Sequence, residues 1–283
     1  MIKANPTIFM IYLAMMDSFS EHLSQKYSSS TLDNPDHYKT IILQKIVRMF
    51  HTLEQIIKEP HDEVSARCVL RGILDSVTTY CFIYQREDRI DMMFRHYLYI
   101  LDGFTTYKKA IIDGILEKGE DKKIFENTYD EVDKQILSKL SSHPYYKIDR
   151  KQAEILMEHA NWRYESLNNT TKMKFREMYK LIKLEDRLVN YYQNILSQYA
   201  HGLFLSNTTF IHSGQLQKVL FESIPLADRI IQGICRTFPK DDLICFFLRS
   251  DACRGILNNP DFNTNDLLDF AKTFLRKDKT ILV

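Results

Sequence analysis

The sequence predicts an all-α fold, a multi-helix bundle followed by a helical C-terminal subdomain. Its 283 residues include only 8 glycines and 7 prolines, fewer turn-forming residues than a β-sandwich or a doubly wound sheet needs. Apolar residues also recur at the helical period of 3.6 residues through most of the chain. Because 45% of the residues are hydrophobic, the chain is able to bury a substantial core.

The first half of the chain is predicted to form long helices separated by short polar breaks. The segment SSSTLDNPD separates the first two helices, and GEDKK separates the fourth from the fifth. Pro35 stands where helix starts favour proline, and Pro60 follows the end of the same helix. The predicted helices span residues 7–27, 36–58, 62–85, 88–118 and 121–140.

The second half is predicted to be helical as well, with shorter helices at first. The sequence HPY breaks the pattern after residue 140, NNTT separates two short helices, and SNTTFIHSG supplies a longer break with room for a few extended residues. We therefore expect a core domain at 1–205 and a C-terminal subdomain at 206–283. The helices expected here span residues 149–159, 172–183, 185–204, 215–237, 240–257 and 264–276.

Composition excludes several classes of function. The 38 basic and 37 acidic residues balance, so no overall charge attracts nucleic acid or a membrane surface. Five cysteines without a CxxC pair lie in apolar or helical stretches, which favours free thiols and a cytoplasmic protein. The apolar run from Ile8 to Met16 is too short to span a bilayer and precedes no signal-peptidase site, so we expect neither export nor a membrane partner.

No strong catalytic motif is present. The sequence lacks a phosphate-binding P-loop, GxGxxG after a strand, HExxH, GxSxG and any Cys/His spacing typical of a metal site. We therefore expect no cofactor and no metal.

Two polar stripes on otherwise apolar helices are the most informative feature. Arg67, Arg71 and Asp75 lie one helical turn apart in the first, and two arginines on one face can hold a phosphate or a carboxylate. An alternative is a solvated face with an ordinary ion pair between Arg71 and Asp75.

The second stripe ends in a histidine. Its polar residues recur at helical spacing in RLVNYYQNILSQYAHG: Asn190, Asn194, Ser197 and His201. A histidine beside these groups could act as a general acid or base, since its pKa of about 6.5 is near neutral pH. It could equally cap the helix together with Gly202. We expect the first stripe to lie within side-chain reach of the helix that carries the second.

Two family resemblances follow from these segments. The first resemblance rests on RCVLRGILDSVTTYCFIY, on the long helix after it, and on a later Leu-Ser-x-Tyr-x-His that includes Ser197, Tyr199 and His201. Through these segments, over about residues 62–205, the chain resembles the bacterial domain of unknown function family 5677. That resemblance implies an α-helical bundle without an established activity.

The segment SQYAHG more distantly resembles the end of the Arg-x4–6-His motif of HEPN domains, many of which are metal-independent RNases in toxin and phage-defence systems. The resemblance places the motif histidine at His201. The motif arginine should fall at 194–196, which are Asn194, Ile195 and Leu196, so an RNase would need Arg67 or Arg71 to supply the guanidinium.

Two functional hypotheses remain at this point. The first is a binding module that uses the polar stripes, with Asp75, Asn190, Asn194, Ser197 and Tyr199 as contact residues. Its partner would be RNA or a nucleotide, another protein, or a second copy of the chain. The alternative is an RNase in which His201 transfers the proton and Arg67 and Arg71 stabilise the charge on phosphate.

Overall fold

A computed structural model describes residues 6–59, 62–114, 120–182, 184, 186–201 and 213–249. Within these ranges the protein is predominantly helical, which confirms the predicted fold class. The predicted helix 264–276 and the end of 240–257 lie outside the described residues, as does most of the break at 206–214.

Contacts divide the chain into two compact units. The first unit contains 1–30, 36–85 and 178–283, and the second contains 31–35 and 86–177. This division differs from the expected boundary between residues 205 and 206, because α12 (Ser213–Thr237) packs against α1 (Pro6–Lys26) and α3 (Glu63–Tyr84) in the first unit. The second unit is instead an insertion between α3 and the later helices of the first.

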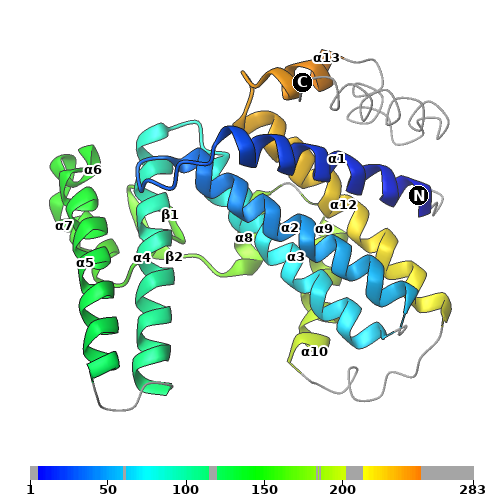
Figure 1. The fold of residues 1–283 in the computed structure, drawn as a ribbon, viewed down its shortest axis with the longest axis horizontal. Helices are drawn as coiled ribbons and strands as arrows, with labels where there is room; N and C mark the ends of the chain where they lie inside the picture. The colour runs from blue at the N-terminus through cyan, green and yellow to red at the C-terminus, as the bar shows by residue number, and fades with distance from the viewer. Residues whose placement is uncertain are drawn as a thin grey trace. The chain divides into compact units, whose positions relative to one another are not determined.

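The helix α3 forms the centre of the first unit. Every residue of its C-terminal part, from Ser76 to Tyr84, is buried, as is typical of a helix that is apolar on all faces. Two glycines permit close packing around it: Gly72 leaves room for the Met49 side chain of α2 (Pro35–Lys58), and Gly233 of α12 faces the Tyr80 ring. Figure 1 shows α1, α2, α3 and α12 side by side.

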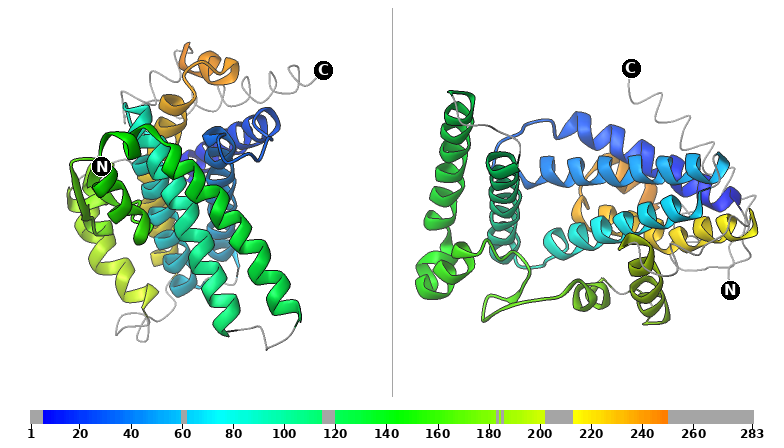
Figure 2. Two further views of the ribbon diagram at one scale, coloured as in Figure 1. Left: turned by 90° about the vertical axis from the view of Figure 1, so that its left-hand side faces the viewer. Right: turned by 90° about the horizontal axis from the view of Figure 1, so that it is seen from below.

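The second unit is built on two long antiparallel helices, α4 (Arg89–Gly114) and α5 (Glu120–Ser142), which Figure 2 shows adjacent to each other. The short helices α6 (Pro144–Ile148) and α7 (Arg150–Glu158) and the hairpin of β1 (Tyr164–Ser166) and β2 (Asn169–Lys172) complete it. We did not predict α6 or this hairpin. A two-residue turn at 167–168 and the β-branched Thr170 and Thr171 are local signals for the hairpin.

A buried arginine organises the second unit. Arg95 of α4 is fully buried, and its guanidinium carbon lies 3.6 Å from the centre of the Tyr164 ring. It donates hydrogen bonds to the carbonyls of Trp162 (3.0 Å) and Tyr164 (2.6 Å), and it pairs with Asp91 at 3.2 Å. The guanidinium of Arg95 thus joins α4 to β1 and to the residues just before it through directional hydrogen bonds.

The first unit continues after the insertion with α8 (Phe175–Leu181), in which the chain passes from one unit to the other. Next come α9 (Asp186–Tyr191), the π-helical turn η1 (Tyr192–Leu196) and α10 (Ser197–Ala200), which form one continuous helix over 186–200, here named the seam helix. The last described helix is α13 (Asp242–Arg249). Among the described residues, no helix is long and apolar enough to cross a bilayer.

Candidate functional site: the seam between α3 and the seam helix

The polar stripe of α3 begins at a well-formed helix N-terminus. Asp62 accepts hydrogen bonds from the backbone N–H groups of Val64 (3.0 Å) and Ser65 (3.2 Å), so it caps the helix. A hydrogen bond from the Ser65 hydroxyl makes the largest contribution to lowering the pKa of Asp62, and the two backbone bonds lower it further. The cap fixes the start of α3 and therefore the direction in which Arg67 and Arg71 point.

The polar stripe of α3 reaches the seam helix, as we expected. Arg67 Nη1 donates to the Tyr191 hydroxyl at 2.7 Å, and Arg71 Nη1 donates to Ser197 Oγ at 3.2 Å. Both acceptors belong to the seam helix. The prediction that the first stripe lies within side-chain reach of this helix is confirmed.

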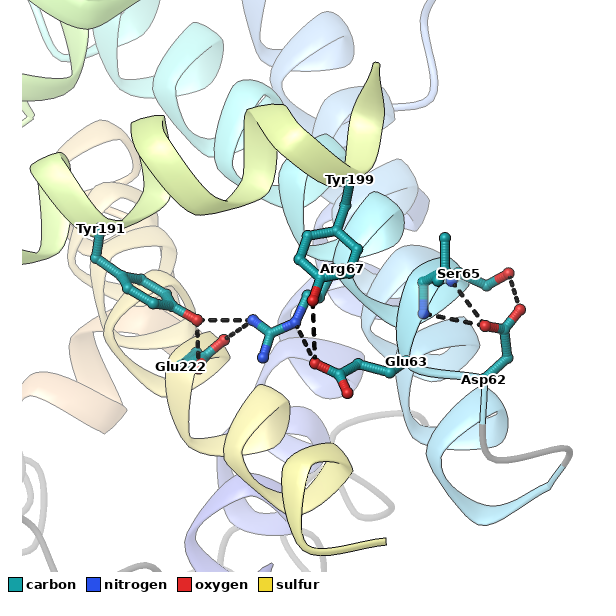
Figure 3. A network of polar contacts seen from close by, with 8 residues as sticks. Asp62, Glu63, Ser65, Arg67, Tyr191, Tyr199 and Glu222 are labelled. Carbon is teal, nitrogen blue, oxygen red and sulfur yellow. Dashed lines mark hydrogen bonds and ion pairs between the residues drawn. The ribbon is translucent and has the colours of Figure 1, made fainter. Parts of the chain in front are cut away.

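Two carboxylates enclose Arg67 on α3 and α12 (Figure 3). Its Nε donates to Glu63 Oε1 at 2.7 Å, and its Nη1 donates to Glu222 Oε2 at 3.0 Å. Tyr191 donates to the second oxygen of Glu222 at 2.6 Å, which closes a triangle of hydrogen bonds. Arg67 and Glu63 are each 5% exposed. Groups of the protein itself therefore occupy the Nε and Nη1 donors of this guanidinium.

The electrostatics of this network are unbalanced, with one cation between two carboxylates. Burial acts to lower the pKa of Arg67, but the charge of Glu222 and the bond to Glu63 outweigh it and raise that pKa. Burial raises the pKa of Glu222, and the nearby Arg67 only partly offsets this. Arg67 therefore stays charged, and burial disfavours the ionised form of Glu222.

Tyr199, one of the expected contact residues, is buried in the same network. The Arg67 guanidinium lies 5.1 Å from the centre of its ring, and its hydroxyl donates to Glu63 Oε1 at 3.4 Å. The tyrosine ring favours a cation over its face, so Tyr199 supports Arg67. At 8% exposure it presents little surface to a ligand.

Arg71 lies in a more open place. Its Nε donates to Asp75 Oδ2 at 3.2 Å, and its guanidinium lies 5.5 Å from the centre of the Tyr179 ring. Tyr179 donates its hydroxyl to the other oxygen of Asp75. Burial raises the pKa of this tyrosine, and the Asp75 charge adds to the effect. The Arg71 side chain is 18% exposed and that of Asp75 36%, against 6% for Arg67.

Three of the expected site residues lie elsewhere. Asn190, Asn194 and His201 are exposed, and none of the bonds that join the seam helix to α3 involves them. The prediction of one continuous stripe assumed a regular α-helix. The π-helical turn changes the number of residues per turn between Tyr191 and Ser197, so residues on its two sides are out of the assumed phase.

His201 is the residue at the C-terminal cap of α10. Its backbone N–H donates to the Ser197 carbonyl at 3.2 Å. This is a bond of the backbone, so the two alternatives for the imidazole, a cap and a proton-transfer group, both stay predictions. Gly202 lies outside the described residues.

Sequence reasoning missed four residues of this region: Glu63, Tyr179, Tyr191 and Glu222. Glu63 stands four residues before Arg67, a spacing that pairs opposite charges on a helix. Glu222 stands three residues before Pro225, which has no backbone N–H to donate within α12. The carbonyl of Glu222 accepts the Tyr192 hydroxyl, so this residue faces the seam helix with its backbone as well as its side chain.

In the described part of the chain, no group of three or more His, Cys, Asp or Glu side chains is placed to hold a metal ion. The carboxylates of the seam are instead bonded to arginine and tyrosine.

Comparison with known proteins adds no family. No protein-family model, no curated protein and no solved structure matches this chain. The resemblances to the family of unknown function and to HEPN domains thus stay predictions.

Proposed function

We propose that this chain is a helical binding module that holds a phosphate group of RNA or of a nucleotide at Arg71. One observation carries the proposal: Arg71 is the partly exposed arginine of the seam, and beside the ion pair of its Nε with Asp75 its Nη1 donates to a neutral hydroxyl, Ser197. A guanidinium donor bonded to a neutral partner can exchange that partner for a phosphate oxygen, with which it forms a stronger, charge-assisted hydrogen bond.

Arg67 supports this role without contacting the ligand. Its Nε and Nη1 already face Glu63, Glu222 and Tyr191, the residue is only 5% exposed, and the two carboxylates would repel a phosphate. Its contribution is to hold the seam helix against α3, so that Ser197 and Arg71 are adjacent.

The proposal is tested with a fluorescently labelled single-stranded RNA oligonucleotide at low salt, followed by anisotropy. Arg71→Ala should weaken binding by about tenfold or more, because a charged hydrogen bond contributes about 1.5–3 kcal/mol. The matched control is Arg48→Ala on α2, which removes an equally charged, exposed side chain and should leave the affinity unchanged. Competition by AMP separates a nucleotide ligand from an RNA ligand.

Two results would overturn the proposal. One is an absence of RNA and nucleotide binding in the wild-type protein, and the other is an equal loss in both variants, which would indicate general charge attraction. The RNase alternative has its own outcome: metal-free cleavage of the oligonucleotide that His201→Ala abolishes while the melting temperature stays unchanged.

A further inference from the structure

The π-helical turn of the seam helix lies between its two groups of contacts with α3. Residues 192–196 form this turn, Tyr191 precedes it and Ser197 follows it. A π turn holds more residues than an α turn, because each bond spans five residues instead of four. Such turns are rare in proteins and occur mostly as single insertions at functional sites.

The turn shows a local defect as well as an unusual geometry. The side-chain nitrogen of Gln193 is buried and has no hydrogen-bond partner among the described residues. A buried donor without an acceptor costs free energy that a partner would recover. This cost and the general rarity of π turns together indicate that contacts outside the turn stabilise it.

Those contacts lie on both sides. Before the turn, Tyr191 bonds to Arg67 and Glu222. After it, Ser197 accepts from Arg71 and the Tyr199 ring lies over Arg67. The seam helix is thus attached to α3 on both sides of the turn, and the π turn contains the extra residue between the two attachments.

A second arrangement follows from helix geometry. If the turn relaxed to α-helix while Tyr191 stayed in place, each residue after the turn would rotate by about 100°, the angle of one residue in an α-helix. Ser197 would leave Arg71, and Tyr199 would leave Arg67. Local geometry favours this α arrangement, and the tertiary contacts favour the π arrangement, so the two compete.

We propose that residues 192–196 form a register switch that covers and releases Arg71. In the π arrangement Ser197 occupies Nη1 of Arg71, and in the α arrangement this donor is free. A phosphate ligand that binds the free donor shifts the population toward the α arrangement. This last step rests on the proposed function, whereas the switch itself does not.

Deletion of Asn194 is the sharpest test. This residue is exposed, and its removal leaves a regular α-helix with Tyr191 and Ser197 still on their present faces. The deletion variant should therefore keep Arg71 bonded to Ser197 without a π turn. We expect a higher melting temperature and a rate of Arg71 modification by phenylglyoxal that is lower by about threefold or more, read by mass spectrometry. The modification rate of Arg48 should not change.

Ser197→Ala serves as the opposite variant, since it frees Arg71 in the π arrangement, and we expect faster modification of Arg71. A fall in melting temperature on deletion of Asn194, or an unchanged modification rate at Arg71, would overturn the switch. If the wild-type protein binds no RNA or nucleotide while these rates behave as expected, the proposed ligand is wrong and the switch stands.

Discussion

Arg67 is the residue whose loss should damage the first unit most. Arg67→Met removes the guanidinium between Glu63 and Glu222 and leaves the two carboxylates, one buried and one largely buried, without their cation. Removing one partner of a buried ion pair costs about 3–5 kcal/mol of unfolding free energy. Urea unfolding of the full chain measures this loss.

Glu222→Gln is the matched comparison for that variant. The amide keeps the size of the side chain and an acceptor oxygen for Arg67, and it cannot carry a negative charge. We expect its unfolding free energy to lie within about 1 kcal/mol of wild type or above it. Equal losses in Arg67→Met and Glu222→Gln would show that the network acts through shape and not through charge.

His143 in the second unit predicts a dependence of stability on pH. Burial lowers its pKa from 6.5 to about 4, and its Nδ1 accepts a hydrogen bond from the Tyr145 backbone N–H at the start of α6. The fold therefore favours neutral histidine. Its contribution to stability is present above the unfolded-state pKa of 6.5 and is lost as the pH falls toward 4.

His143→Asn isolates this effect, because asparagine caps a helix and does not titrate. Chemical unfolding at several pH values between 7 and 4 should show a smaller loss of stability for the variant than for wild type. Parallel curves for the two proteins would contradict the assignment to His143.

At the scale of elements, α13 is attached to α1 through one buried carboxylate. Asp241 accepts from the backbone N–H of Leu243 (3.1 Å) and Ile244 (3.3 Å) and also contacts His22 (3.1 Å) and Lys26 (2.7 Å). Burial alone would raise the pKa of Asp241, but the bonds to these two side chains outweigh it and lower that pKa. One residue thus caps α13 and joins it to α1.

Two variants separate these roles. Asp241→Asn keeps an acceptor for the cap and loses the ion pairs, whereas Asp241→Ala loses both. We expect the alanine variant to be less stable than the asparagine variant by about 1 kcal/mol, the contribution of a helix cap. Thermal unfolding compares the two variants. Equal melting temperatures would show that the cap does not stabilise α13.

The elements also show where sequence periodicity succeeds. The long helices α2, α3 and α12 begin and end within two residues of their predicted ranges, because burial of one or more faces imposes the 3.6-residue period on their apolar residues. The hairpin at 164–172 has only seven strand residues, too few for a periodic signal. Trp162 and Tyr164 are anchored there through contacts with Asp102 and Asp91, which lie 60 and 73 residues away in the sequence.

At the scale of the molecule, the cysteines predict a graded reactivity. Burial raises the pKa of both Cys81 and Cys235 to about 12, whereas Cys68 and Cys245 are partly exposed. The thiolate is the reactive form, so alkylation of the native chain should label Cys68 and Cys245 well before the two buried thiols. Peptide mass spectrometry follows the order.

Unfolding in urea without a reductant provides the control for that order. All five thiols should then react, including Cys253, which lies outside the described residues. A cysteine that stays unlabelled after unfolding would indicate a disulfide and contradict the expectation of free thiols.

The sequence by itself determined the helical class, most helix boundaries and the facing of Arg67 and Arg71 toward the seam helix, because these depend on periodicity and on spacing along one chain segment. The tertiary structure decided which arginine is open. Glu222 lies 155 residues after Arg67 and meets it only because α12 packs on α3. The π turn likewise takes Asn190 and Asn194 out of the predicted stripe. Contacts with other helices stabilise this turn, and such contacts cannot be inferred from the local sequence.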